Sequence, residues 1–562
     1  MHSPADDRPD DTRPLPRVSV PAPRRGQRAP ATPAVPAGFG GSTGPAEPTE
    51  PQEAPEPAGP GYRIPEPRET GWAMDASPRR DRISRLILLG ILAVQAVLCA
   101  RLADANTASQ DEALALTSGH DRLARLTHGA RLPLDPTELL SGSPFLHPLL
   151  AALVDERAGL LGVRVLGLLC MVGTTALLYS LTRRMFNERV ALIGAALFAV
   201  LPSTVVLGFS ATYDAPALLL LTAAAWIVGR TDRAPLPAVL LAAPVAALAV
   251  CTAYASVFFL PALAGLVLLT AWPHHGRAAF LRTLVFGVGV AALLGAAAWM
   301  LPGFPGGVAA GRVPGTGATT ELLRSSALWG ALMLVSACAG AVSYTWRGRM
   351  NESPLSLRMS GPGRRRRSLV GVLLCGTAVL APAFQLRPDT PAALYAHLGF
   401  GMLFAAPMAG IGLTRLVGKH FRYPQLGIML WVTLLCLGIA QSEQRFASWP
   451  DARLLTPVLK EHITPGAEGR YLASAPHVAV YYLRDRTDGS RWTALSDRPA
   501  AAVRAGIDSG AYDLVVLDDV TSPGASRAAE AALAGSGKYH LVGQIPFHIG
   551  DGLGKYRIWA KR

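Results

Sequence analysis

The sequence has few charged residues and few cysteines for a chain of 562 residues. Only 16% of its residues are charged whereas 50% are hydrophobic, and the mean hydropathy is +0.29. A water-soluble protein carries more charge, so an ordinary soluble enzyme is excluded. All six cysteines lie inside apolar stretches and form no CxxC pair. We therefore expect neither a disulfide framework nor a cysteine metal site.

Long apolar stretches account for the low charge. About 11 of them approach the 20 residues needed to cross a hydrocarbon core of about 30 Å. The predicted fold class is therefore a polytopic α-helical membrane protein. The predicted spans are 84–103, 159–182, 189–208, 213–229, 236–252, 255–272, 280–301, 325–345, 368–386, 396–416 and 425–441.

Basic residues indicate how the spans are oriented. The net charge is +14, but the basic residues cluster in short loops and form no nucleic-acid-binding motif, so no nucleic-acid partner is expected. Arginines before the first span place the N-terminus in the cytoplasm and residues 104–158 outside. Basic loops then alternate with poorly charged ones. The run Arg364–Arg367 also fits a lipid-headgroup patch, although topology alone accounts for it.

The two ends of the chain differ from the apolar region at 79–441. Residues 1–78 are rich in proline, glycine, alanine, arginine and glutamate, and cannot bury enough surface to offset their ordering entropy. They predict a disordered cytoplasmic tail. Residues 442–562 alternate short Val-, Leu- and Tyr-rich runs with helical patterns, which predicts a small α/β domain. An odd number of spans places this domain outside the cytoplasm.

Two adjacent carboxylates, Asp111 and Glu112, follow the first span in the outer loop 104–158. Ionised carboxylates near the membrane interface are costly unless they are used or solvated. One of the pair could accept the proton of an acceptor hydroxyl, as glycosyl transfer requires, while the other orients a substrate. An exposed acid pair without a function is the alternative.

A third acid, Asp214, follows Tyr213 and opens the fourth span on the same predicted face as Asp111. Capping of a helix N-terminus accounts for an acid at that position. Two acids from separate outer loops could also frame one site or bind a divalent cation through oxygen ligands. Asp111 and Asp214 are thus the candidate metal ligands, and no other cofactor is expected.

The motifs follow a particular order: Asp111-Glu112 after the first span, His147-Pro148 before the second, Arg183-Arg184-Met185-Phe186 after it, and Asp214 at the fourth. This order resembles the GT-C glycosyltransferases, above all the protein O-mannosyltransferases and the lipid A aminoarabinose transferases. The resemblance is best over residues 84–230. It implies a GT-C-like transmembrane domain at 79–441, with its catalytic loop at 104–158.

The resemblance also implies the reaction. Such an enzyme moves a sugar from a polyprenyl-phosphate-linked donor to a glycan, lipid or protein acceptor at the outer face of the membrane. Asp111 takes the catalytic acid position, Glu112 is its neighbour, and Asp214 takes the second acidic position. The alanine-, arginine- and glycine-rich composition is typical of a GC-rich bacterial genome, so we expect a multi-pass protein of the bacterial plasma membrane and cell envelope.

The chain departs from this family where an arginine precedes the second acid, because residues 210–212 read Ser-Ala-Thr. A phosphate contact must then come from elsewhere. Arg387 and His397, near the start of a late span, are the candidates for the leaving phosphate. Anchoring at the membrane interface explains them equally well. His147 and Tyr213 complete the predicted substrate-binding residues.

Two other functions stay open. A transporter or flippase of lipid-linked sugars predicts ionisable residues at mid-membrane and broken helices, whereas the acids here lie at helix ends. A non-catalytic membrane protein, whose outer domain binds a glycan or a protein partner, is not distinguished from an enzyme by the sequence.

Overall fold

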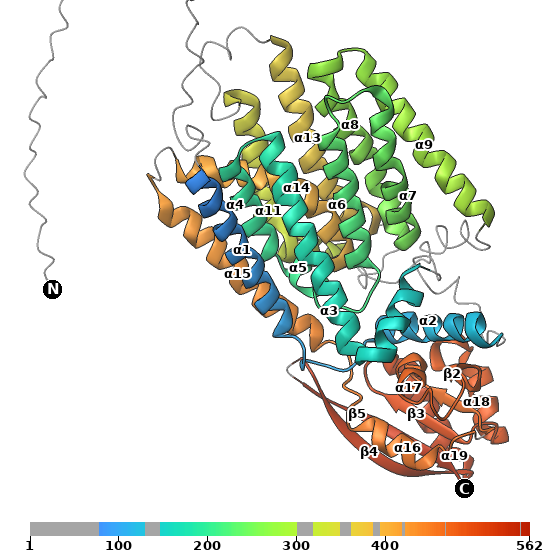
Figure 1. The fold of residues 1–562 in the computed structure, drawn as a ribbon. Coiled ribbons are helices and arrows are strands. Elements are labelled where there is room, and N and C mark those ends of the chain that lie inside the picture. The colour runs from blue at the N-terminus through green and yellow to red at the C-terminus, as the bar shows by residue number, and fades with distance from the viewer. Residues whose placement is uncertain are drawn as a thin grey trace, which may run out of the picture. The chain divides into compact units, whose positions relative to one another are not determined.

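The computed structural model describes residues 78–129, 146–300, 319–348, 361–385, 394–418, 422–466, 468–550 and 552–562. The predicted tail at 1–78 lies outside the described residues, apart from its last residue, and so does Arg387. What is described is mostly helical, with a small sheet region near the C-terminus (Figure 1). The predicted class, a polytopic helical membrane protein with a C-terminal α/β region, is confirmed.

Eight helices among the described residues are long and apolar enough to cross a membrane. They are α1 (Pro78–Ala100), α3 (Leu146–Met185), α8 (Leu260–His275) with the preceding 3-10 helix η3 (Tyr254–Phe259), α9 (Ala278–Met300), α11 (Thr319–Arg347), α13 (Gly361–Gln385), α14 (Leu394–Val417) and α15 (Pro424–Phe446).

Three predicted spans form shorter helices: α4 (Glu188–Ala199) with α5 (Pro202–Leu207), α6 (Asp214–Arg230), and the 3-10 helix η2 (Leu236–Leu241) with α7 (Ala242–Thr252). The break between α4 and α5 falls before Pro202, because proline lacks a donor N–H and disfavours helical backbone in the residue before it. The expected total of 11 spans therefore stays a prediction.

Helix α14 lies at the centre of the bundle. Its most apolar window is 89% buried, against 44% or less for the other candidate spans. Small residues allow neighbouring helices to approach it closely. A Cβ atom at Gly412 would lie 2.1 Å from the Ser336 carbonyl oxygen of α11, and one at Gly340 of α11 would lie 1.9 Å from the Met408 carbonyl oxygen. Glycine is required at both contacts.

The loop between α1 and α3 contains α2 (Gln110–His128), which crosses the end of the bundle beside the C-terminal region (Figure 1). Helix α3 then begins at Leu146 and is interrupted at Gly159, whose φ of 64° is favourable only for glycine. The interruption separates the segment that packs on α2 from the segment that continues through the bundle.

The C-terminal region has a five-stranded sheet in the order β2-β1-β3-β5-β4. Strand β1 is parallel to β2 and β3, while β5 is antiparallel to β3 and β4. The strands are β1 (Tyr471–Ala473), β2 (Trp492–Ala494), β3 (Leu514–Asp518), β4 (Tyr539–Ile549) and β5 (Gly552–Lys561). The helices are α16 (Leu455–His462), α17 (Pro476–Tyr482), α18 (Ala500–Ser509) and α19 (Pro523–Ser536), with 3-10 helices η5 (Gly489–Arg491) and η6 (Leu495–Asp497).

Asp155 of α3 joins this region to α3 and α2. Its buried carboxylate accepts hydrogen bonds from the Tyr481 hydroxyl at 2.7 Å and from Arg484 Nη1 at 2.5 Å. His120 Nε2 of α2 lies 2.7 Å from the same carboxylate. In addition, Ala108 N–H donates to the Tyr482 hydroxyl at 2.9 Å. The C-terminal region therefore packs on the same end of the bundle as α2.

We predict that Asp155→Ala loosens this attachment. The change leaves the buried Tyr481 hydroxyl and Arg484 without their acceptor, which costs roughly 2 kcal/mol of stability. Limited proteolysis and thermal unfolding in detergent measure the effect. Glu156→Ala is the matched control, because its carboxylate is 49% exposed and lies 3.9 Å from His120. Equal behaviour of the two variants would show that Asp155 does not hold the region in place.

Candidate functional site

The site is built on the N-terminus of α2. Ser109 caps the helix, because its Oγ accepts from the Glu112 N–H at 3.3 Å while its own N–H donates to Glu112 Oε2 at 2.9 Å. This reciprocal pair is a capping box and fixes where the helix begins. Asp111 and Glu112 consequently both lie in its first turn, where the positive end of the helix dipole favours carboxylates.

Glu112 forms a buried ion pair with Arg164 of α3, and each side chain is only 2% exposed. Arg164 Nε donates to Glu112 Oε1 at 3.1 Å and Nη2 donates to Oε2 at 2.8 Å. The Ala211 N–H adds a bond to Oε1 at 2.7 Å. With the Ser109 bond, four donors enclose the carboxylate. The Glu112 carboxylate is thus occupied by protein donors, which suits a positioning role, and the catalytic role expected of it stays a prediction.

The remaining donors of Arg164 hold the chain that precedes α2. Its Nη1 donates to the Asn106 carbonyl oxygen at 3.0 Å and its Nη2 to that of Thr107 at 3.1 Å. The Asn106 amide in turn donates to the carbonyl oxygens of Phe446 and Trp449, at 2.7 and 2.9 Å. The loop before α2 is thus attached both to α3 and to the end of α15.

Asp111, by contrast, has a solvent-exposed side chain. The protein around it is nevertheless dense enough for desolvation to raise the pKa of its carboxyl above the ordinary value. Arg445 opposes this shift and lowers the pKa, whereas the neighbouring charge of Glu112 raises it further. Asp111 is therefore an accessible carboxylate with an increased proton affinity, which suits a general base.

Side chains from three further helices lie within electrostatic range of Asp111: Arg445 of α15, Asp214 of α6 and Tyr395 of α14. The Arg445 guanidinium lies 4.7 Å from the centre of the Tyr395 ring, a cation–π distance. Asp214 is 8% exposed and accepts from the Thr212 hydroxyl at 3.2 Å. We call these four side chains the acid–arginine cluster.

The other predicted site residues are His147, Tyr213, His397 and Arg387, and none of them belongs to the acid–arginine cluster. His147 is buried at the start of α3, and its ring meets that of Tyr213 edge-on at 6.3 Å. His397 lies two residues after Tyr395 on α14, so the two side chains face different sides of that helix. Tyr395 is the residue of this pair whose contact with Arg445 is established. The phosphate contact expected from Arg387 cannot be located, because that residue lies outside the described part.

A divalent cation stays a prediction. Among the described residues, no three His, Cys, Asp or Glu side chains lie close enough together to hold a metal ion. Asp111 and Asp214 supply two carboxylates from separate elements. Their environment already contains a cation, the Arg445 guanidinium, which interacts electrostatically with Asp111.

Arg164 and Arg445 were not among the site residues predicted from the sequence. Arg164 is a charged residue inside a predicted apolar span, and such a residue signals a buried partner. Arg445 lies beyond 441, where the last span was expected to end, but α15 continues to Phe446 and brings Arg445 into the cluster. Tyr395 carried no signal, because a tyrosine at the end of a span is typical of any membrane helix.

Comparison with known proteins is informative once this geometry is established. The family model for dolichyl-phosphate-mannose-protein mannosyltransferases matches residues 142–301. ArnT from Cupriavidus metallidurans is 14% identical, with a TM-score of 0.54 over 86% of this chain and 98% of that one. The chain has the GT-C fold. The predicted resemblance to GT-C transferases is thereby confirmed at the level of the fold.

The GT-C arabinofuranosyltransferase AftD from Mycobacteria is also similar, at 15% identity and a TM-score of 0.50. The alignment covers 85% of this chain but only 40% of AftD. No curated protein sequence matches the chain. The segment that matches the family model contains Arg164 and Asp214 but not Asp111. At these identities the likeness to solved structures gives the fold of the chain.

We predict that Glu112→Gln and Asp111→Asn have different effects, although both replace a carboxylate by an amide. Glu112→Gln leaves the buried Arg164 charge unpaired and is expected to cost about 3 kcal/mol of stability. Asp111→Asn is expected to leave the thermal unfolding midpoint in detergent nearly unchanged, because the side chain is exposed. Equal unfolding midpoints for Glu112→Gln and wild type would contradict the positioning role.

Proposed function

We propose that this protein transfers a sugar from a polyprenyl-phosphate-linked donor to an acceptor hydroxyl, with Asp111 as the general base. The observation that carries the proposal is the unequal environment of two adjacent acids. Glu112 is enclosed by four hydrogen-bond donors, whereas Asp111 is accessible and lies in electrostatic range of Arg445. An accessible base beside a cation is what transfer from a lipid phosphate requires.

In the proposed reaction the acceptor oxygen attacks the anomeric carbon of the donor. A carbon–oxygen bond forms between acceptor and sugar, and the bond from that carbon to the phosphate oxygen breaks. The acceptor proton passes to Asp111, and the bonding electrons leave with the polyprenyl phosphate. Arg445 stabilises the negative charge on the departing phosphate through charge-assisted hydrogen bonds. Tyr395 holds the guanidinium in place from its other side.

The comparisons support this class of donor. The matching family model is named for dolichyl-phosphate-mannose, and ArnT has also been solved with undecaprenyl phosphate. Both ligands join a phosphate to a polyprenyl chain. In this chain the acid–arginine cluster lies at the ends of apolar helices, so a lipid tail could remain among the helices while the phosphate reaches Arg445.

The remaining predicted residues fit supporting roles. Asp214 would orient the acceptor or bind a cation, and His147 with Tyr213 would line the sugar position. The C-terminal region packs on α2 at the same end of the bundle. We place this end at the outer face of the plasma membrane, with the N-terminus in the cytoplasm, because basic loops follow the opposite helix ends.

Release of polyprenyl phosphate from a panel of polyprenyl-phosphate sugars tests the proposal directly. Wild-type protein is expected to release it, and Asp111→Asn is expected to be slower by a factor of about 100 or more, since the amide cannot accept the proton. Asp104→Asn is the matched control, because Asp104 is an exposed carboxylate of the same loop.

The control is expected to keep the wild-type rate. Unchanged release by a folded Asp111→Asn variant would remove Asp111 from the reaction. If folded wild-type protein released no polyprenyl phosphate from any donor, the proposed donor class would be wrong.

The pH dependence of the reaction supplies a further prediction. A base must be ionised, so kcat/KM is expected to fall as the pH drops through the raised pKa of Asp111. Arg445 lowers that pKa, so Arg445→Gln should move the acid limb upward by as much as about one pH unit.

Arg453→Gln is the matched control for this shift, because Arg453 is an exposed arginine at the same end of the bundle. Its acid limb should coincide with that of wild type. If the acid limb does not move in Arg445→Gln, Arg445 does not act on the pKa of the catalytic base.

A further inference from the structure

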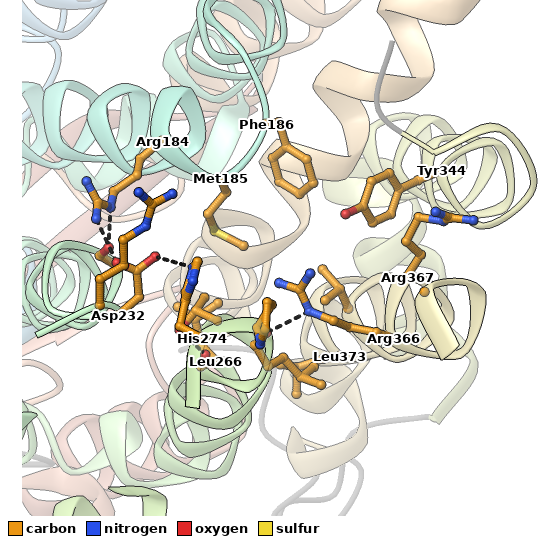
Figure 2. Close-up of a pocket in the computed structure, with 17 residues that line it drawn as sticks. Arg184, Met185, Phe186, Asp232, Leu266, His274, Tyr344, Arg366, Arg367 and Leu373 are labelled. Carbon is orange, nitrogen blue, oxygen red and sulfur yellow. Dashed lines mark hydrogen bonds and ion pairs between the residues drawn. The ribbon is translucent and has the colours of Figure 1, made fainter. Parts of the chain in front are cut away.

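A cavity lies at the opposite end of the bundle, far along the helices from Asp111. It has a volume of about 600 Å³ and is formed where α3, α6 and α8 end, beside the last turn of α11 and the first turns of α13. This volume falls within the range of ordinary small-molecule sites, about 300–1,000 Å³. Figure 2 shows the side chains that surround it. We call it the basic pocket.

Four arginines line the basic pocket: Arg184, Arg233, Arg366 and Arg367. Among the lining residues the structure describes, Asp232 is the single acid. It accepts from Arg184 Nη2 at 2.6 Å, with His274 Nε2 at 3.9 Å (Figure 2). The lining therefore carries more positive than negative charge. Arginines gathered around a cavity favour an anion that accepts several hydrogen bonds.

One of these arginines is held in position by the backbone. Arg366 Nε donates to the Leu269 carbonyl oxygen of α8 at 2.9 Å, which ties the first turns of α13 to α8 (Figure 2). A guanidinium fixed in this way loses little freedom when it binds a ligand, because part of its ordering has already occurred. The positive end of the α13 dipole also faces this end of the bundle and favours an anion.

The rest of the pocket wall is apolar. The pocket is also lined by Met185, Phe186, Leu266, Val370 and Leu373, and Figure 2 shows Phe186 beside Tyr344 and Leu373 beside Arg366. A small apolar cavity deeper in the bundle shares Met185 and Leu266 with the basic pocket. The pocket thus combines a cationic surface with an apolar one, and a ligand that fits both has an anionic head and an apolar tail.

The neighbouring surface of α13 is suited to acyl chains. Leu369 and Val372 are 57% and 69% exposed, and Trp346 of α11 is 65% exposed. Apolar side chains on a helix of a membrane protein face lipid when they are exposed in this way. A lipid bound through its headgroup in the basic pocket would therefore have apolar protein surface beside its chains.

We propose that the basic pocket is a binding site for the phosphate of an anionic phospholipid. Basic pockets between membrane helices on the cytoplasmic side are known to bind such headgroups. The site is separate from the acid–arginine cluster, because Asp214 of the cluster begins α6 whereas Gly229, near the end of α6, lines the pocket. The proposal does not rest on transferase activity, and its test needs none.

Native mass spectrometry of the purified full-length protein in detergent tests the site, with phosphatidylglycerol and phosphatidylcholine as the two probes. Phosphatidylglycerol should be retained and phosphatidylcholine should not. The double variant Arg233→Gln, Arg366→Gln should weaken phosphatidylglycerol binding at least about tenfold, because it removes two phosphate donors. The double variant Arg230→Gln, Arg277→Gln removes the same charge at the same end of the bundle outside the pocket, and should bind as wild type does.

A second arm separates a lipid headgroup from free phosphate. Inorganic phosphate at millimolar concentration should not displace phosphatidylglycerol, because it lacks the apolar tail; full displacement would overturn the lipid assignment. If both double variants lose lipid equally, net charge rather than the pocket explains the binding, and the proposal is overturned. If the pocket variant fails to fold, Arg366→Lys keeps the charge and loses the planar fork, and wild-type binding by that variant would count against the site.

Discussion

The end of the bundle that contains α2 depends on one buried guanidinium. Arg164 lies inside the helix bundle, where an unpaired charge would cost several kcal/mol. Each of its three nitrogens donates to a fixed acceptor, and these acceptors are the Glu112 carboxylate and the carbonyl oxygens of Asn106 and Thr107. The aromatic rings of Phe209 and Phe446 lie 6.0 and 5.5 Å from the guanidinium. Satisfying this charge therefore brings α2, α3 and the end of α15 together, and the start of α2 cannot move without exposing it.

The position of Asp111 follows from this constraint. Successive residues on a helix point about 100° apart, so fixing Glu112 toward Arg164 directs Asp111 to a different side. That side contains Arg445, which α15 supplies from beyond the apolar part of its sequence. Asp155 holds the C-terminal region at the same end through Tyr481 and Arg484. Two adjacent acids thus have different surroundings: Glu112 is buried against Arg164, whereas Asp111 is exposed and is the proposed base.

Much of the fold could be predicted from the sequence, because apolar length and basic loops are local signals. Asp111 and Asp214 were also found locally, by their positions at the ends of apolar stretches. The contact between Arg164 and Glu112 could not be predicted in this way. The two residues are far apart in the chain, and only the packing of α2 on α3 joins them. Arg445 was missed for a related reason. The sequence around Arg445 is polar and is typical of a loop. The helix nevertheless continues to Phe446, where the Asn106 amide donates to the carbonyl oxygens of Phe446 and Trp449.

The central claim is that Asp111 and Arg445 face one substrate, with the phosphate at the arginine and the acceptor at the carboxylate. A cryo-electron microscopy map of the protein with a polyprenyl phosphate bound tests this most directly. We expect phosphate density within hydrogen-bonding distance of the Arg445 guanidinium, with the polyprenyl chain among the apolar helices and the Asp111 carboxylate facing the phosphate across an open space. A map without phosphate density at Arg445, or with phosphate there that packed side chains separate from Asp111, would contradict the account.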